Sequence, residues 1–109
     1  MKYLKIKKNA DFQKIFNKGK KVFSPYITFL YFNGGKLSMG LAVSKKHGGA
    51  VKRNRIKRLL REAFRAECGE LEKPCSIILI PKVSEHYSVE NFKDSLKVCF
   101  KKVNECRKS

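Results

Sequence analysis

The sequence predicts one mixed α and β domain over residues 1–109, with its elements in the order α-β-β-α-β-α. Three observations lead to this prediction. The chain has 109 residues, near the commonest domain size. Hydrophobic residues make up 42% of it, which is enough to build one core. Stretches with the 3.6-residue period of a helix alternate with stretches that are typical of strands.

The first helix is predicted to begin at Asn9, because asparagine is a favourable N-cap residue. Phe12, Ile15 and Phe16 then follow at the spacing of one helical face. Gly19 suits the left-handed residue that closes many helices.

Two antiparallel strands are expected next. Residues Val22–Phe32 are largely β-branched and aromatic, Asn33-Gly34-Gly35 is typical of a hairpin turn, and Leu37–Ser44 alternates. Alternation places two sets of side chains on opposite faces of the second strand: Leu37, Met39, Leu41 and Val43 on a core face, and Ser38, Gly40, Ala42 and Ser44 on a face of small groups. Another chain or ligand can approach the face of small groups closely.

In the second half of the chain, the sequence predicts a long helix from Ala50 to Cys68 that ends at Gly69. A buried strand is expected over Cys75–Ile80, followed by a last helix that Ser88 caps. The apolar side of the long helix contains Ile56, Leu59, Leu60, Ala63 and Phe64. The last helix keeps the 3.6-residue period through Val89, Phe92, Leu96, Cys99, Phe100, Val103 and Cys106.

The charge is unevenly distributed. The chain has 26 Lys and Arg against 9 Asp and Glu, a formal net charge of +17. Residues 1–61 hold 17 of the basic residues and a single acidic one, Asp11. Such an excess repels itself unless a polyanion relieves it. We therefore expect the N-terminal half to carry a binding face for nucleic acid.

The densest basic segment is Ser44–Arg61, in which eight of eighteen residues are Lys or Arg and none is acidic. A solvated helix face is the alternative interpretation, but such faces mix charges of both signs. Here Arg53 with Lys57, and Lys57 with Arg61, repel at i,i+4 by about 0.2–0.5 kcal/mol each. Only Arg58 with Glu62 offsets them. Phosphate at the positive end of the helix would reverse these costs.

RNA is favoured over DNA because the major groove of A-form RNA is too narrow for a helix, so a basic helix would contact phosphates and 2′-hydroxyls. Exposed aromatic rings offer a second mode of binding by stacking on single-stranded bases. The candidates are Phe12, Phe16, Phe29 and Tyr31, with core packing as the alternative for each.

Enzyme sites are poorly supported. Only Asp11 precedes the acidic group Glu62, Glu67, Glu70 and Glu72, so a nuclease site with two protein-bound metal ions is disfavoured. His47 could contact phosphate, and a catalytic pair with His86 would need a close tertiary approach. The four cysteines, at 68, 75, 99 and 106, lack the spacing of a zinc site and are expected as free thiols. No apolar run has the length of a membrane span or signal peptide, so we expect a cytoplasmic protein.

The sequence resembles the protein subunit of bacterial ribonuclease P along essentially its whole length. The resemblance rests on three motifs: Lys52-Arg53-Asn54-Arg55-Ile56-Lys57-Arg58-Leu59-Leu60-Arg61-Glu62, Gly40-Leu41-Ala42-Val43-Ser44-Lys45-Lys46, and Asp11-Phe12-Gln13-Lys14-Ile15-Phe16 with Gly19. It implies an α+β two-layer sandwich with a left-handed β-α-β crossover through the arginine-rich helix. The general preference for right-handed crossovers would not have predicted that handedness.

The resemblance also implies a function. The family's particle removes the 5′ leader from precursor tRNA, and its RNA subunit holds the catalytic Mg²⁺, so we expect neither a catalytic residue nor a metal site in this chain. Contacts with the catalytic RNA are implied for Arg53, Asn54, Arg55, Lys57, Arg58 and Arg61, and the basic segment adds Lys45, Lys46 and Lys52. A leader-binding cleft is implied for Phe12, Phe16, Tyr31, Ser44 and Lys46. Outside the particle the protein is expected to be monomeric.

Two alternatives stay open at this point. One is an RNA scaffold similar to a ribosomal protein, which would have no leader cleft. The other is a nuclease made of protein alone, which would depend on His47 and His86.

Overall fold

The computed structural model describes the backbone of residues 3–71 and 74–108, and side chains as far as residue 105. The helices and strands in this part of the chain are β1 (Leu4–Lys5), α1 (Asn9–Lys18), β2 (Lys20–Phe23), β3 (Ile27–Asn33), β4 (Ser38–Leu41), α2 (Ala50–Glu67), β5 (Cys75–Pro81) and α3 (Val89–Lys108). Two short 3₁₀ turns, Lys45–His47 and Cys68–Glu70, flank α2. Among the described residues, no helix is both long and apolar enough to cross a membrane.

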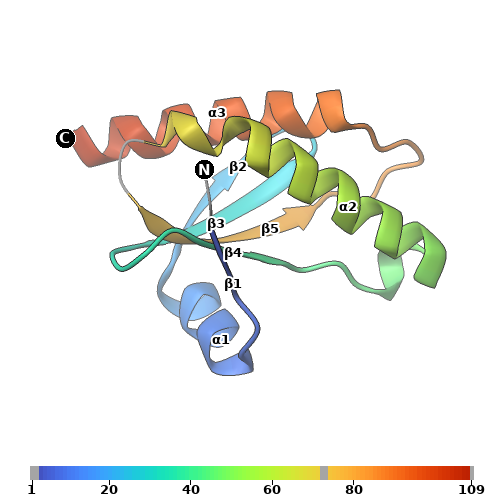
Figure 1. The fold of residues 1–109 in the computed structure, drawn as a ribbon, viewed down its shortest axis with the longest axis horizontal. Coiled ribbons are helices and arrows are strands. Elements are labelled where there is room, and N and C mark those ends of the chain that lie inside the picture. The colour runs from blue at the N-terminus through green and yellow to red at the C-terminus, as the bar shows by residue number, and fades with distance from the viewer. Residues whose placement is uncertain (1–2, 72–73, 109) are drawn as a thin grey trace.

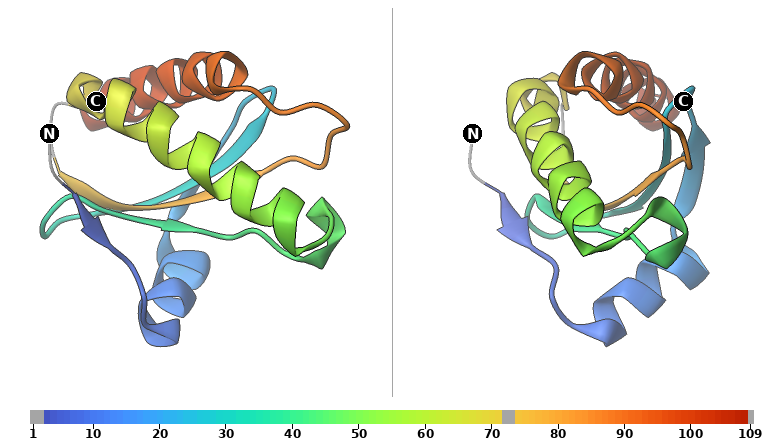
Figure 2. Two further views of the ribbon diagram at one scale, coloured as in Figure 1. Left: turned by 45° about the vertical axis from the view of Figure 1, so that its right-hand side comes forward. Right: turned by 90° about the vertical axis from the view of Figure 1, so that its right-hand side faces the viewer.

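The strands form one mixed sheet in the order β1-β4-β5-β3-β2. Helices α2 and α3 lie side by side over one face of the sheet, and α1 lies against the other face (Figure 1). The end-on view in Figure 2 shows the same layers. The predicted α+β class is confirmed, and α1 adds a short third layer to the main sandwich.

Two apolar cores follow from the alternation along β3. The larger core lies between the sheet and α2 and α3, where Phe100 packs edge to face on Phe29 and Phe64 with ring centres 5.6 and 5.9 Å apart. The smaller core lies beneath α1 and contains Leu30 and Ile15. Because Phe29 and Leu30 are neighbours in a strand, they point to opposite faces.

The predicted hairpin between residues 22–32 and 37–44 is wrong. Asn33-Gly34-Gly35 does connect β3 to β4, but β5 lies between these two strands, antiparallel to β3 and parallel to β4. The physical reason is burial. Strand β5 is apolar on both faces, which suits the centre of a sheet covered on both sides.

The hairpin is instead formed by β2 and β3, within the stretch that was predicted as one strand. The chain turns at Ser24-Pro25-Tyr26, where the Ser24 hydroxyl donates a hydrogen bond of 2.6 Å to the Ile27 carbonyl. The N-terminal strand β1 was not predicted either. It pairs in parallel with β4, with Leu4 opposite Ser38 and Lys5 opposite Met39.

The connection from β4 through α2 to β5 joins two parallel neighbouring strands. Viewed from the helices with these strands pointing upward, β5 lies to the left of β4, so the crossover is left-handed (Figures 1 and 2). This agrees with the handedness that the family resemblance implied.

The ends of the helices differ in how well the sequence predicts them. Asn9 is the first residue of α1 rather than its cap, which is Lys8. Gly19 has an extended backbone, and glycine is needed there because a Cβ atom would collide with the carbonyl oxygens of Ile15 and Tyr31. Ser88 does cap α3, since its hydroxyl accepts a hydrogen bond of 3.1 Å from the Asn91 N–H.

Candidate nucleic-acid interface

The positive end of α2 is open. Gly48 has a φ of +126°, which disfavours side-chain-bearing residues, and Gly49 precedes the helix in an extended conformation. No side chain caps the first turn of α2, and no acidic residue lies in it. The backbone N–H groups of this turn are therefore available to an anion.

The outer face of α2 is basic, as the helical wheel predicts. Ile56, Leu60, Ala63 and Phe64 are buried against the core, and Leu59 is half-buried. The side chains on the outer face that are exposed are Lys52, Asn54, Arg55, Arg58 and Arg65, whereas Arg53, Lys57 and Arg61 are half-buried. The cations of the basic segment that belong to α2 therefore lie on the side of that helix away from the core, and Lys45 and Lys46 precede it in a 3₁₀ turn.

Carboxylates do not neutralise this face. In the described part of the chain the single ion pair joins Lys97 on α3 to Glu67 at the end of α2, at 3.8 Å. The expected pair between Arg58 and Glu62 does not form. The like charges at i,i+4 therefore repel without compensation, as they would on a surface that binds an anion.

Two cations of the first turn also have local contacts. Lys52 Nζ lies 5.9 Å from the centre of the Tyr87 ring, a distance typical of a cation–π contact. Arg53 Nε is buried and has no hydrogen-bond partner among the described residues. An unsatisfied buried donor costs about 1–3 kcal/mol, so Arg53 is not placed for stability alone.

The side chain of His47 is buried and stabilises the turn before α2. His47 is 2% exposed. Its Nδ1 accepts a hydrogen bond of 3.0 Å from the Ser44 N–H, and its Nε2 lies 2.6 Å from the Pro81 carbonyl oxygen, to which it donates. Both ring nitrogens are thus occupied by backbone groups, and the expected contact of His47 with phosphate is wrong. Lys45 and Lys46 beside it are exposed.

The face of small groups on β4 is approached closely, as its sequence predicts. The ring of Phe12 from α1 lies over Gly40, where an added Cβ atom would be 2.7 Å from the ring. Phe16 on the same helix is 41% exposed, and Ser44 is exposed beyond the end of β4. Helix α1 thus presents one seated and one accessible aromatic ring beside the sheet.

Tyr31 and Phe29 are not available for stacking. Tyr31 is 2% exposed and belongs to the core under α2 and α3, on the face of the sheet opposite α1. Phe29 is fully buried in the same core. The expected place of Tyr31 in a cleft beside α1 is therefore wrong, because alternation along β3 gives that face to Leu30 instead.

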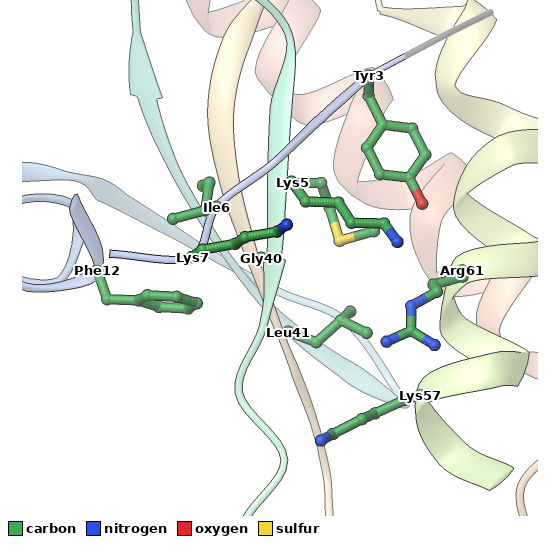
Figure 3. A pocket seen from close by; sticks show the side chains of 10 residues that line it. Tyr3, Lys5, Ile6, Lys7, Phe12, Gly40, Leu41, Lys57 and Arg61 are labelled. Carbon is green, nitrogen blue, oxygen red and sulfur yellow. The ribbon is translucent and has the colours of Figure 1, made fainter. Parts of the chain in front are cut away.

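Two cavities flank the N-terminal strand. The first, of about 320 Å³, lies between β1, β4 and α2, and Lys5, Lys7, Lys57 and Arg61 direct their nitrogen atoms into it (Figure 3). Tyr3 and Phe12 also line it. The second, of about 260 Å³, is lined by Asp11, Lys14, Ser38 and Ser76 among others, on the α1 side of the sheet.

The described residues do not gather the ligands of a metal centre, since no three His, Cys, Asp or Glu side chains lie close together there. Cys68 and Cys99 are buried free thiols, and Cys75 is buried at the start of β5. The side chain of Cys106 lies outside the described residues.

Comparisons with known proteins agree with the motifs. The family model "Ribonuclease P" matches residues 1–104. The chain belongs to the ribonuclease P protein family. The ribonuclease P protein component of Bacillus velezensis is 41% identical over 109 residues, covering 96% of this chain and 93% of that protein.

Solved structures support the same relationship. The RNase P protein of Staphylococcus aureus is 34% identical, with a TM-score of 0.77 over 94% of this chain and 96% of that one. The RNase P protein of Thermotoga maritima is 30% identical, with a TM-score of 0.79 over 90% and 96%. The chain is thus a protein subunit of ribonuclease P, a ribonucleoprotein endoribonuclease of tRNA processing that contains an RNA partner.

Sequence reasoning missed Lys5 and Lys7 of this ribonuclease P protein. They alternate with Leu4 and Ile6, which is the pattern of a short strand. A strand of two residues is too short for that pattern to be distinctive, and its pairing with β4 is what brings the two lysines opposite α2.

Proposed function

We propose that this ribonuclease P protein binds the catalytic RNA through the basic face of α2 and the 5′ leader of precursor tRNA beside α1. The residues proposed to contact the catalytic RNA are Lys45, Lys46, Lys52, Arg53, Asn54, Arg55, Lys57, Arg58 and Arg61. Residues 1–109 act as one domain in this proposal, and the protein is monomeric outside a cytoplasmic particle.

One observation carries the proposal. The cations of α2 begin in its open first turn and continue along its outer face, and within the described residues none of them forms an ion pair. Phosphate is the ligand that satisfies both features, because helix N-termini and arginine side chains both bind it. A folded RNA presents many phosphates close together, so several of them can contact the cations along one face of a helix.

The leader-binding part of the proposal keeps four of the five predicted residues: Phe12, Phe16, Ser44 and Lys46. An exposed ring at Phe16 supports stacking on a single-stranded base, and the exposed Lys46 supports a contact with its phosphate. Tyr31 is removed because it is buried on the other face.

Catalysis is assigned to the RNA. The donor set of this chain does not fit a Mg²⁺ centre, because its described residues bring no suitable group of carboxylates together. We therefore assign Mg²⁺ to the RNA subunit. The protein's own residues neutralise phosphates and hold the leader in one path, which lowers the cost of ordering the substrate.

Reconstitution tests this proposal. The purified protein is incubated with precursor tRNA, with and without the RNA subunit, at low Mg²⁺ concentration. We expect no cleavage by the protein alone, and cleavage at the leader junction by the assembled particle at a Mg²⁺ concentration where the RNA alone is slow. Efficient cleavage without the RNA subunit would overturn the proposal.

A second measurement distinguishes leader binding from a scaffold role. The assembled particle is titrated with precursor tRNA and with mature tRNA, which lacks the leader. Tighter binding of the precursor, and a loss of that difference in Phe16→Ala, supports the leader site. Equal affinity for the two RNAs would favour the scaffold.

A further inference from the structure

The cavity between β1, β4 and α2 brings together cations from two distant parts of the sequence. Lys5 and Lys7 come from the N-terminal segment, and Lys57 and Arg61 come from α2 (Figure 3). None of the ten residues that line the cavity is acidic. Its volume of about 320 Å³ lies at the lower end of the range for ligand pockets.

The two walls of this cavity are held in place before any ligand binds. The Tyr3 ring packs edge to face on Phe64 of α2, with ring centres 5.0 Å apart. The Ile6 N–H donates a hydrogen bond of 3.1 Å to the Met39 carbonyl of β4. These contacts on either side of Lys5 fix the N-terminal segment opposite α2, so the convergence of charge is built into the fold.

The cations of the cavity have no internal counter-ion. Lys5, Lys7, Lys57 and Arg61 form no ion pair within the described residues. Asp11, the one carboxylate before Glu62, lines the second cavity instead. Four cations around one space repel each other, and an anion in that space would remove the repulsion.

The cavity also offers hydrogen-bonding and apolar groups. The carbonyls of Leu37 and Met39 accept hydrogen bonds from the N-terminal segment, so the N–H and C=O of Leu41 point to the same side of β4. Strand β1 ends at Lys5, and no backbone hydrogen bond reaches Leu41 on that side within the described residues. Phe12, with Gly40 beneath it, supplies an apolar floor.

We propose that this cavity binds a nucleotide of single-stranded RNA, with a phosphodiester between the N-terminal lysines and Lys57 and Arg61, so that the N-terminal strand forms a second arm of the RNA-binding surface. The inference rests on the proposed function for its partner. The strand comes from the catalytic RNA or from the leader, which share this chemistry. RNA is favoured over an acidic peptide because Lys57 and Arg61 continue directly into the basic face of α2.

The experiment uses Lys5→Ala/Lys7→Ala in the full-length protein. Both side chains are exposed and form no ion pair in the described residues, so folding should be unchanged by circular dichroism. The matched control is Lys82→Ala/Lys101→Ala, which removes the same charge from exposed positions that form no ion pair among the described residues. Arg58→Ala reports separately on the α2 face.

Two affinities are measured over a range of salt concentrations. The first is that of the protein for the RNA subunit, and the second is that of the assembled particle for precursor tRNA with and without a leader. We expect one of these two affinities to fall about tenfold in Lys5→Ala/Lys7→Ala. The slope of log K against log salt concentration should also become flatter by about 1.4, because two contacts with single-strand phosphates are lost. The control variant should change the affinities and the slopes by less than this, because it lowers only the overall charge of the protein.

The affinity that falls identifies the source of the strand. A loss confined to the RNA subunit assigns the cavity to the catalytic RNA, and a loss confined to leader-bearing precursor assigns it to the leader. If both affinities match those of the control while Arg58→Ala still weakens binding, the cavity inference is wrong and the proposed function stands. If Arg58→Ala also has no effect, the proposed function fails. A polyglutamate peptide that competes as well as an RNA oligonucleotide would overturn the choice of RNA.

Discussion

Arg58 is the cleanest single position on the basic face. Its side chain is exposed, points away from the apolar stripe of α2, and forms no ion pair in the described residues. Its charge therefore contributes little to folding, and any role that it has is in binding. A substitution at Arg58 is therefore expected to change the affinity for RNA without changing the stability of the fold.

Replacing Arg58 by alanine should leave the free energy of unfolding within about 0.5 kcal/mol of the original value. Affinity for the RNA subunit should fall, with a salt slope flatter by about 1. Urea unfolding and filter binding measure the two effects. Arg65→Ala, an exposed arginine of the same helix outside the proposed set, is the control. A large loss of stability in Arg58→Ala would contradict its assignment to the outer face.

His47 should behave as a structural residue. His47→Ala removes the hydrogen bonds to the Ser44 N–H and the Pro81 carbonyl, and leaves these groups unsatisfied. We expect a loss of about 1–3 kcal/mol in the free energy of unfolding, with the turnover of particles saturated with folded protein unchanged. If cleavage is lost and stability is retained, His47 has a chemical role that its hydrogen bonds do not explain.

Burial raises the pKa of the Cys99 thiol above its ordinary value of 9.0, against smaller opposing effects of a hydrogen bond with Ser24 and the charges of Lys102 and Lys82. The folded state therefore holds this proton more tightly than the unfolded state does. The resulting stability is complete below pH 9.0 and is lost as the pH rises toward the folded-state pKa.

The Cys99→Ala variant tests this linkage. The difference in the free energy of unfolding between the original protein and Cys99→Ala should shrink as the pH rises from about 7 to about 10. Urea unfolding under reducing conditions measures it at each pH. A difference that is constant or grows with pH would mean that burial does not disfavour the Cys99 thiolate.

At the scale of elements, local pattern predicted the helices better than the strand pairing. The period of α2 and the cap at Ser88 are local features, and both are confirmed. The pairing of β3 with β5 joins residues about fifty positions apart, and the turn at Asn33-Gly34-Gly35 carries no information about it. The continuous apolar character of Cys75–Ile80 was the available signal for a central strand.

In the candidate site, too, the features that depend on local pattern were predicted and those that depend on tertiary pairing were not. The basic face of α2 could be predicted because it depends on one helical wheel. Tyr31 was misplaced because it was assigned from the family resemblance, which does not fix the face of β3 that a residue occupies. Alternation puts Leu30, not Tyr31, on the face that α1 covers. The contribution of Lys5 and Lys7 depends on a tertiary pairing that no local pattern specifies.

The seating of α1 on β4 is open to a direct test at Gly40. A Cβ atom there would be 2.7 Å from the Phe12 ring, so Gly40→Ala must displace the ring or the helix. We expect about 1–3 kcal/mol of destabilisation and weaker binding of precursor tRNA that carries a leader. Gly69→Ala, where the added atom meets nothing within 4 Å, is the control. Unchanged stability and leader affinity in Gly40→Ala would show that Phe12 is not seated on β4 as described.

At the scale of the whole molecule, the charge and the fold agree. Seventeen basic residues and one acidic residue precede Glu62, and this part of the chain contains α1, β4 and nearly the whole basic face of α2. The later part, with β5 and α3, is close to neutral and supplies much of the larger core. One half of the sequence thus provides the proposed binding surface, and the other half completes the core that supports it.

The most direct test of this account is the salt dependence of binding between the full-length protein and the RNA subunit. If about six phosphates are neutralised, log K should fall against log salt concentration with a slope of roughly −4 to −5. A flat response would contradict the central claim that this surface recognises RNA through its phosphates.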